Sequence, residues 1–264
     1  MKDLLLSLQS EFYKSRKTLG FWSAIILPLL ICLLVFSGFY SNSAKLAKFP
    51  GIMLWIQFAG AIINVMGALL LPMLVIFITY SVNSIEHKAD SWKTIFSLPV
   101  SKWAVYSAKF VYAMFLIALC LFLFLTFTIV LGNLLGSLKP ELRFADYHME
   151  NLLVQVYIKL FLSSLGILSI QFLLSLLWAD FLKPMGLGFV GTIAGAITAA
   201  VSWKYAYLFP YASPSLAVKS LPRPKPGSSD ITVDIFTDNI YASLIVFAVI
   251  FIAGFYIVQK KSVK

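Results

Sequence analysis

Residues 110–131 have the sequence FVYAMFLIALCLFLFLTFTIVL, which contains no charged side chain. A helix of about 20 apolar residues is long enough to cross the hydrocarbon core of a bilayer, which is about 30 Å thick. Five further uncharged runs of similar length lie around it, at residues 21–40, 62–82, 160–178, 185–201 and 240–258. The sequence therefore predicts an all-α membrane protein in which a single domain, residues 1–264, contains six transmembrane helices.

The composition excludes a soluble enzyme. Of the 264 residues, 60% are apolar and 12% are charged, whereas about 25% of a typical soluble domain is charged. The net charge of +10 would indicate nucleic-acid binding in a soluble protein. Here the basic residues flank apolar runs, so we expect no nucleic-acid partner. Both cysteines lie inside apolar runs, which excludes a disulfide-rich scaffold.

The second span lies within a longer uncharged stretch, residues 49–85. This stretch is too long for one crossing and lacks the polar turn that two crossings would need. Its first part contains Pro50, Gly51, Trp55 and Gln57, residues that favour a lead-in at the membrane interface. We therefore place the span itself at residues 62–82.

The distribution of Lys and Arg predicts the orientation in the membrane. Six spans place both termini on one side. The segments on that side hold 12 of the 21 basic residues and the other side holds nine, four of them in a longer segment where the positive-inside rule weakens. We expect both termini to be cytoplasmic.

The six assigned spans contain no Asp, Glu, Lys, Arg or His. Ion-coupled transporters and voltage sensors keep such groups near the middle of the membrane, so the energy for transport must come from elsewhere. The chain also lacks a GxxxxGK[ST] phosphate loop, an HExxH zinc helix and a GxSxG elbow. We expect a subunit that is not an enzyme and has no catalytic, cofactor-binding or metal-binding residues of its own.

Two local patterns have both a functional and a structural interpretation. Residues 186–191, GLGFVG, fit the dinucleotide-binding pattern, but they open an apolar run instead of following a strand. We attribute their small residues to close helix packing in lipid. Asp146, His148 and Glu150 alternate as metal ligands can, although three polar residues in an outer loop are more often simply solvated.

Two segments on the cytoplasmic side have a distinctive pattern. The leader, residues 1–20, is amphipathic, and its Phe12, Lys14, Arg16 and Lys17 suit the headgroup plane of a membrane. The loop at residues 83–109 predicts a short helix from 86 to 98, ended by Pro99, with Ser101 capping the next helix. Its apolar side chains would lie against the membrane or enter a partner's groove; they are Trp92, Ile95, Phe96 and Leu98.

The outer segment, residues 202–239, begins with aromatic residues and prolines. It includes Trp203, Tyr207, Pro210 and Pro214. Aromatic rings of this kind rest at headgroup level or in a re-entrant dip.

These features resemble the permease subunits of type-2 ABC transporters, and among them the bacterial permeases of lantibiotic immunity and bacitracin export. The matching residues are the leader sequence SEFYK at 10–14, the span holding Pro28, the loop sequence SWKTIFSLPVS at 91–101, Ala108-Lys109, and the tail VQKK at 258–261. The resemblance covers the whole chain.

The resemblance implies an N-terminal elbow helix at residues 1–20 and a re-entrant outer element at 202–221. It also implies a cytoplasmic coupling helix at 86–98, whose contact residues with the ATPase would be Glu86, Trp92, Lys93, Ile95, Phe96, Leu98 and Pro99. Two permeases, identical or homologous, would sit on two copies of a separate ABC ATPase that binds ATP and Mg. The expected location is the bacterial inner membrane, in contact with lipid.

On this basis we hypothesise that the chain is the permease of an ATP-driven exporter. Spans without charges suit an amphipathic cargo, such as a peptide antibiotic or a lipid, because a strongly charged molecule would lack partners there. Two alternatives stay open at this stage. One is a regulatory or structural membrane subunit without transport, and the less favoured one is an intramembrane enzyme, for which the spans offer only scattered Ser, Thr and Asn.

Overall fold

The computed structural model describes residues 2–92, 94, 99–221 and 233–260. Within these ranges the regular elements are helices and no strand occurs. Six helices are long and apolar enough to cross a membrane, as the sequence predicts. They are α2 (Leu19–Ser41), a continuous helical rod Gly51–Lys88, α7 (Lys102–Leu138), α8 (Glu150–Leu177), α9 (Leu182–Ala200) and α11 (Asp238–Lys260).

Shorter elements connect or flank these six helices. They are α1 (Lys2–Ser15), α3 (Ser43–Leu46), the 3₁₀ turns η2 (Pro140–Leu142), η3 (Phe144–Asp146), η4 (Ala206–Leu208) and η5 (Pro210–Ala212), and α10 (Ser213–Lys219). Two of the helix starts have the caps that their sequences favour. Thr18 accepts a hydrogen bond from the N–H of Phe21 at 3.3 Å, and Ser101, as predicted, accepts one from the N–H of Ala104 at 3.3 Å.

The rod Gly51–Lys88 differs from the expected interfacial lead-in and separate span. It consists of α4 (Gly51–Val65), a π turn η1 (Met66–Leu70) and α5 (Leu71–Lys88). Its 38 residues extend over about 57 Å at 1.5 Å per residue. Because no polar turn interrupts the stretch, the helix continues through it, and the residues expected at the interface form its first turns. The rod also includes Glu86, which we expected to begin the coupling helix.

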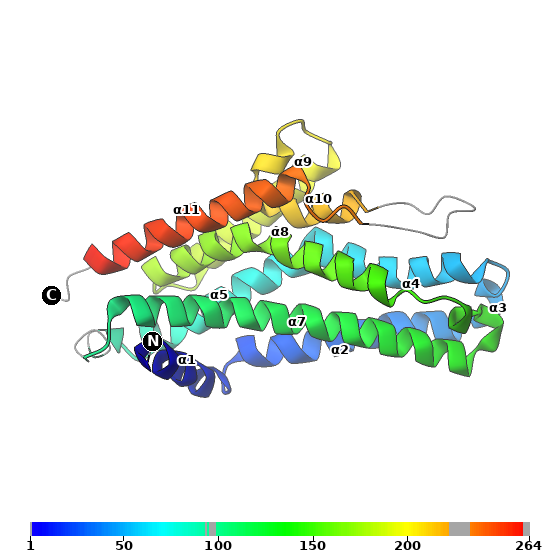
Figure 1. Cartoon of the computed structure of the whole chain (residues 1–264), viewed down its shortest axis with the longest axis horizontal. Helices are drawn as coiled ribbons and strands as arrows, with labels where there is room; N and C mark the ends of the chain where they lie inside the picture. The colour runs from blue at the N-terminus through cyan, green and yellow to red at the C-terminus, as the bar shows by residue number, and fades with distance from the viewer. Residues whose placement is uncertain (1, 93, 95–98, 222–232, 261–264) are drawn as a thin grey trace.

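Both termini lie toward the same end of an elongated bundle, which we call the terminal end (Figure 1). The rod and α7 run along the long axis, and α5 ends and α7 begins at the terminal end. Here α1 packs on α7, whereas α3 and η2 lie together at the opposite end, the far end. α8 lies in the middle of the bundle, in contact with α5, α7 and α11.

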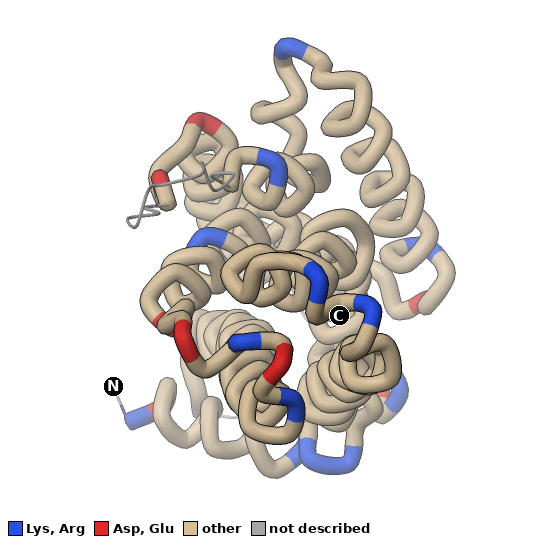
Figure 2. The backbone as a smooth tube through the Cα atoms, turned by 90° about the vertical axis from the view of Figure 1, so that its right-hand side faces the viewer, with Lys and Arg blue, Asp and Glu red and all other residues tan. Residues whose placement is uncertain are grey.

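Charged residues lie mostly at helix ends and connecting turns, and most of the backbone trace carries none (Figure 2). Large apolar side chains are exposed along the outward faces, for example Val190 on α9 and Ile245 on α11. In water such faces would drive aggregation, but lipid covers them at no cost. The surface is therefore that of a membrane protein.

Glycines on α9 allow the close packing that the sequence predicts. A Cβ atom on Gly188 would overlap the side chains of Gln171 and Ile76, and one on Gly195 would overlap the backbone of Tyr211. Small residues at four-residue spacing bring helix backbones together in lipid. The pattern GLGFVG thus contributes to a helix interface, inside a continuous helix that no strand precedes.

Candidate functional site

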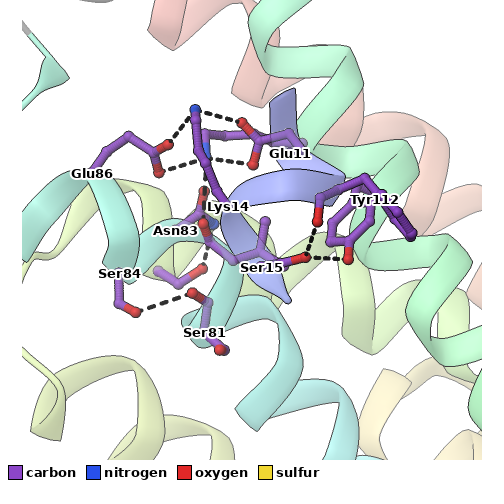
Figure 3. Close-up of polar contacts among 12 residues, drawn as sticks. Glu11, Lys14, Ser15, Ser81, Asn83, Ser84, Glu86 and Tyr112 are labelled. Atoms are coloured by element: carbon purple, nitrogen blue, oxygen red, sulfur yellow. Dashed lines mark hydrogen bonds and ion pairs between the residues drawn. The ribbon is translucent and has the colours of Figure 1, made fainter. Parts of the chain in front are cut away.

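Four charged side chains meet at the terminal end, just inside the loop that joins α5 to α7. We call them the ion-pair cluster: Glu11 and Lys14 of α1, Glu86 of α5 and Lys109 of α7. The ammonium of Lys109 donates to Glu11 Oε2 at 2.9 Å and to Glu86 Oε2 at 2.5 Å. The ammonium of Lys14 donates to Glu11 Oε1 at 3.2 Å and to Glu86 Oε1 at 3.0 Å. The two carboxylates face each other with Lys14 between them (Figure 3).

Three members of the ion-pair cluster are withdrawn from solvent. Glu11 is 3% exposed, and Glu86 and Lys109 are 1% exposed. An isolated charge at such a position would cost several kcal/mol, so each needs a partner of opposite sign. Two carboxylates and two ammonium groups cancel. Lys109 also donates to the carbonyl of Val82 at 3.3 Å, which leaves its three N–H groups engaged.

Lys14 closes the ion-pair cluster on its half-exposed side. Burial alone would lower the pKa of this amine, but the carboxylates of Glu11 and Glu86 outweigh that effect and raise the pKa above its ordinary value. Lys14 therefore stays charged at every physiological pH. Its role differs from the expected one, since its ammonium lies against two carboxylates and not against lipid headgroups.

Further polar contacts fix α1 and the start of α2. Ser15 at the end of α1 is hydrogen-bonded to the phenol of Tyr112 on α7 (Figure 3). The backbone N–H of Gly20 donates to Ser81 Oγ at 3.2 Å, and a Cβ on Gly20 would overlap that serine. Independently of the charges, α1 is thus attached to α7, and the start of α2 is attached to α5.

A second network joins α8 to the same place. His87 Nε2 lies 3.0 Å from the carbonyl oxygen of Ser175, and Trp92 Nε1 donates to His87 Nδ1 at 3.3 Å. Because Nδ1 accepts, the proton of the neutral ring lies on Nε2. Asn83 adds a hydrogen bond to Ser175 Oγ at 2.8 Å. The ring of Trp92 lies 5.7 Å from Lys109 Nζ, so it contacts the ion-pair cluster as well.

The geometry can be compared with known proteins at this point. The family model described as "ABC-2 family transporter protein" matches residues 7–195, nearly three quarters of the chain. The chain belongs to the ABC-2 family. No match was found among curated proteins or among solved structures.

Membership of the ABC-2 family makes the chain a multi-pass membrane protein and a permease component of an ABC transporter. ABC-2 permeases are the transport components and not the catalysts, and they work with an ABC ATPase subunit. The matched residues contain the whole ion-pair cluster and end within α9. The turns η4 and η5 and helix α10 lie beyond the matched range.

Some of the residues expected at the ATPase contact can be placed in the ABC-2 chain. Glu86 is buried in the ion-pair cluster and is not on the surface. Trp92 is half-buried, and Pro99 lies in an exposed bend before α7. The other predicted contact residues, Lys93, Ile95, Phe96 and Leu98, lie outside the described residues. His87, next to Glu86 on α5, contacts α8 through the carbonyl of Ser175 and also contacts the indole of Trp92.

The expected membrane-surface residues of α1 divide into two groups. Phe12 packs against the core, and Lys14 belongs to the ion-pair cluster. Arg16 and Lys17 are exposed, and the guanidinium of Arg16 lies 4.5 Å from the ring centre of Phe12. The exposed basic residues keep the position that binding to anionic headgroups would require.

The expected outer residues lie in the turns that precede α10. Trp203 is exposed, Tyr207 and Pro210 are half-buried, and Pro214 is buried in the first turn of α10. Tyr211, another aromatic residue of this segment, is buried, and its phenol accepts a hydrogen bond from Gln171 Nε2 at 2.6 Å. α10 itself rests on the π turn of the rod, where Ser215 Oγ donates to the carbonyl of Gly67 at 3.0 Å.

The sequence alone does not identify Glu11 and Lys109 as partners of Glu86. A usable signal was present, because Glu86 and Lys109 stand at the two borders of the same loop, next to uncharged stretches. Opposite charges at such borders can pair within the bundle. The resemblance instead places Glu86 at the ATPase contact, and Lys109 counts among the basic residues that flank the spans on the cytoplasmic side.

Proposed function

We propose that this ABC-2 permease is the membrane subunit of an ATP-driven exporter, which moves or extracts an amphipathic molecule such as a peptide antibiotic or a lipid. Two copies of a separate ATPase bind ATP and Mg on the cytoplasmic side, where both termini lie. A second permease, identical or homologous, completes the transporter in the inner membrane of a bacterium. The resemblance to lantibiotic-immunity and bacitracin-export permeases supports the direction and the type of cargo.

The observation that supports this proposal most is the position of the ion-pair cluster. The loop between α5 and α7 is the expected docking site for the ATPase. Both helices that carry it are joined to α1, α7 through Lys109–Glu11 and α5 through Glu86–Lys14. His87 and Trp92 join the same loop to α8. A displacement of the loop by the ATPase would therefore move a connected set of helices and not one isolated turn.

The distribution of charge supports an amphipathic cargo. The charged side chains buried in the long helices, Glu86, Lys109 and Lys159, lie at or beyond the borders of the assigned spans. Glu86 and Lys109 neutralise each other, and Lys159 is held by a hydroxyl and a carbonyl oxygen. No charge remains along the middle of the spans to accompany a strongly charged cargo or a coupling ion.

The proposal predicts that the loop docks an ABC ATPase. The tagged chain, purified from its native membrane in mild detergent, should bring with it an ATPase that mass spectrometry identifies by its phosphate-loop sequence. Replacing Trp92→Ala together with Phe96→Ala should reduce both the amount of bound ATPase and its stimulated hydrolysis, because two apolar anchors are lost from the contact.

The matched control is Trp203→Ala, which removes an exposed tryptophan from another surface and should change neither quantity. If the double variant assembles with the ATPase and stimulates hydrolysis as the parent does, the loop is not the docking site. A regulatory subunit without transport would bind a partner but show no cargo-dependent hydrolysis.

A further inference from the structure

A groove lies between α4, the first half of α8 and α10, in the part of the bundle away from the ion-pair cluster (Figure 1). Its volume is about 380 Å³, within the range of about 300–1,000 Å³ typical of ligand pockets. α4 contributes positions 56, 60 and 64, which share one helix face. The lining residues are Trp55, Ile56, Ala59, Gly60, Ile63, Asn64, Met149, Leu152, Leu153, Val156, Val218, Lys219, Leu221 and Val233.

Gly60 leaves room for the groove on the side of α4. Of the described residues, a Cβ atom on Gly60 would meet only the amide nitrogen of Asn64, at 3.9 Å. Gly60 is therefore not required for helix packing, in contrast to Gly132, where a Cβ would overlap the ring of Trp55. A larger side chain at position 60 would enter the groove itself.

Buried polar contacts hold the cover of the groove in place. Lys159, which is 1% exposed, donates to Ser220 Oγ at 2.7 Å and to the carbonyl of Asp234 at 2.6 Å. One helical turn earlier on α8, Gln155 accepts a hydrogen bond from the N–H of Val233 at 3.1 Å. Leu221 is thus fixed to α8 through its neighbour Ser220, and Val233 through its own N–H. Both residues have a defined position at the side of the groove.

The lining suits a hydrocarbon chain better than a peptide backbone. The indole N–H of Trp55 already donates to the carbonyl of Phe144 at 2.8 Å, and the amide of Asn64 donates to the carbonyl of Gly60 at 2.7 Å. A peptide would bury its own N–H and C=O groups against apolar side chains, at a cost for each unpaired group. A hydrocarbon chain has no such groups.

Lys219 indicates the charge of the ligand that fits. Among the described residues that line the groove it is the charged one, and no carboxylate in that part of the chain lies within 4.0 Å of its ammonium. Its nearest acceptors are the carbonyls of Ala199 and Ala200 at the end of α9. A ligand with an anionic group at this end of the groove would complement the ammonium.

We propose that the groove binds the hydrocarbon chain of the transported molecule, with an anionic head group of that molecule at Lys219. This inference rests on the proposed transport function, and it narrows the cargo to a chain-bearing anionic amphiphile. Bilayer lipid that fills the groove without preference is the competing outcome, and the experiment separates the two.

The probe is stearic acid with a diazirine in its chain, and the matched probe is the corresponding stearyl alcohol. The full chain in phosphatidylcholine nanodiscs is irradiated with each probe, and the labelled residues are mapped by mass spectrometry. We expect labelling concentrated on residues 56–64 and 149–156, with the acid preferred over the alcohol. Unlabelled stearic acid should compete. Lys219→Met should remove the preference for the acid, a change of about tenfold if one charged hydrogen bond is lost.

Gly60→Leu should reduce the labelling at these residues by roughly tenfold, because the added side chain occupies the groove. The control is Gly38→Leu on α2, where an added Cβ meets nothing within 4 Å; it should leave the labelling unchanged. Labelling spread equally over the exposed face of α11, or labelling that Gly60→Leu does not reduce, would overturn the inference. The measurement needs no ATPase, so failure of the groove is distinguishable from failure of the proposed function.

Discussion

Lys109 is the residue on which the charge balance at the terminal end depends. Its ammonium is buried between two carboxylates that belong to different helices. A buried ion pair adds little stability over an apolar pair, but removal of one partner leaves an uncompensated charge and is strongly destabilising. The ion-pair cluster is therefore better explained as a device that fixes the relative positions of α1, α5 and α7 than as a source of net stability.

We expect Lys109→Met to lower the free energy of unfolding by about 3–5 kcal/mol, because Glu11 and Glu86 then share one half-exposed lysine. The measurement is the thermal unfolding midpoint of the detergent-solubilised chain. Lys109→Met combined with Glu86→Gln should recover part of the loss, since one negative charge is removed with the positive one.

The matched control is Lys88→Met, on the exposed side of α5, which should shift the midpoint very little. An equal shift for Lys88→Met and Lys109→Met would show that the buried ion pairs are not what holds the terminal end together.

For individual residues, the sequence predicts only part of the candidate site. The apolar and basic character of the leader, the loop and the outer segment is visible in the composition. The pairing of Glu11 with Lys109, 98 positions apart, is not, because nothing local indicates which charges leave water together. Ser101 could be predicted as a cap since capping depends only on neighbours in the chain.

The rod Gly51–Lys88 is the element that connects the two ends of the bundle. Its π turn carries the contact with α10, and its last turn carries Glu86 and His87. π turns inside long helices are frequent at functional sites. The first half of the rod lines the groove, and its last turn reaches the loop between α5 and α7. A shift of the rod at the groove would therefore also move the residues that carry the loop.

We expect Gly67→Ala to disrupt the packing of α10 against the π turn, because the added Cβ would overlap the side chain of Val218. Overpacking of this kind costs about 1–3 kcal/mol and should lower the thermal unfolding midpoint. The double variant Gly67→Ala with Val218→Ala should restore most of the midpoint, since the overlapping methyl groups are removed.

Gly38→Ala, on α2, is the control for the Gly67→Ala variant. Its Cβ meets nothing within 4 Å, and alanine favours a helix more than glycine does, so the midpoint should stay or rise slightly. A similar loss in both glycine variants would show that the contact with Val218 is not responsible.

The helices themselves could be predicted from the sequence, but not their extents. Six uncharged runs give six helices because an apolar run of that length has few other stable forms in a membrane. The rod and α7 continue beyond the assigned spans because a helix ends where a cap or a proline ends it, and a change in hydropathy alone does not end it. Ser101 caps α7, which begins at Lys102, eight residues before the apolar run.

The whole molecule has a polar end that is locked together and an apolar groove in its other part. Family membership establishes the first as part of a permease that works with an ABC ATPase. The long rod joins the proposed cargo groove to the loop that we propose as the ATPase contact. We propose that this chain is a transducer, which converts energy from the ATPase subunit into movement of its own helices.

Reconstitution in sealed vesicles tests this account most directly. The chain is incorporated alone or with the ATPase that co-purifies with it, and uptake of a fluorescent anionic amphiphile is followed with ATP and Mg or with an imposed proton or sodium gradient. We predict uptake only when the ATPase and ATP are both present, and none in vesicles that contain the chain alone. Uptake by the chain alone on an ion gradient, without the ATPase, would contradict the account.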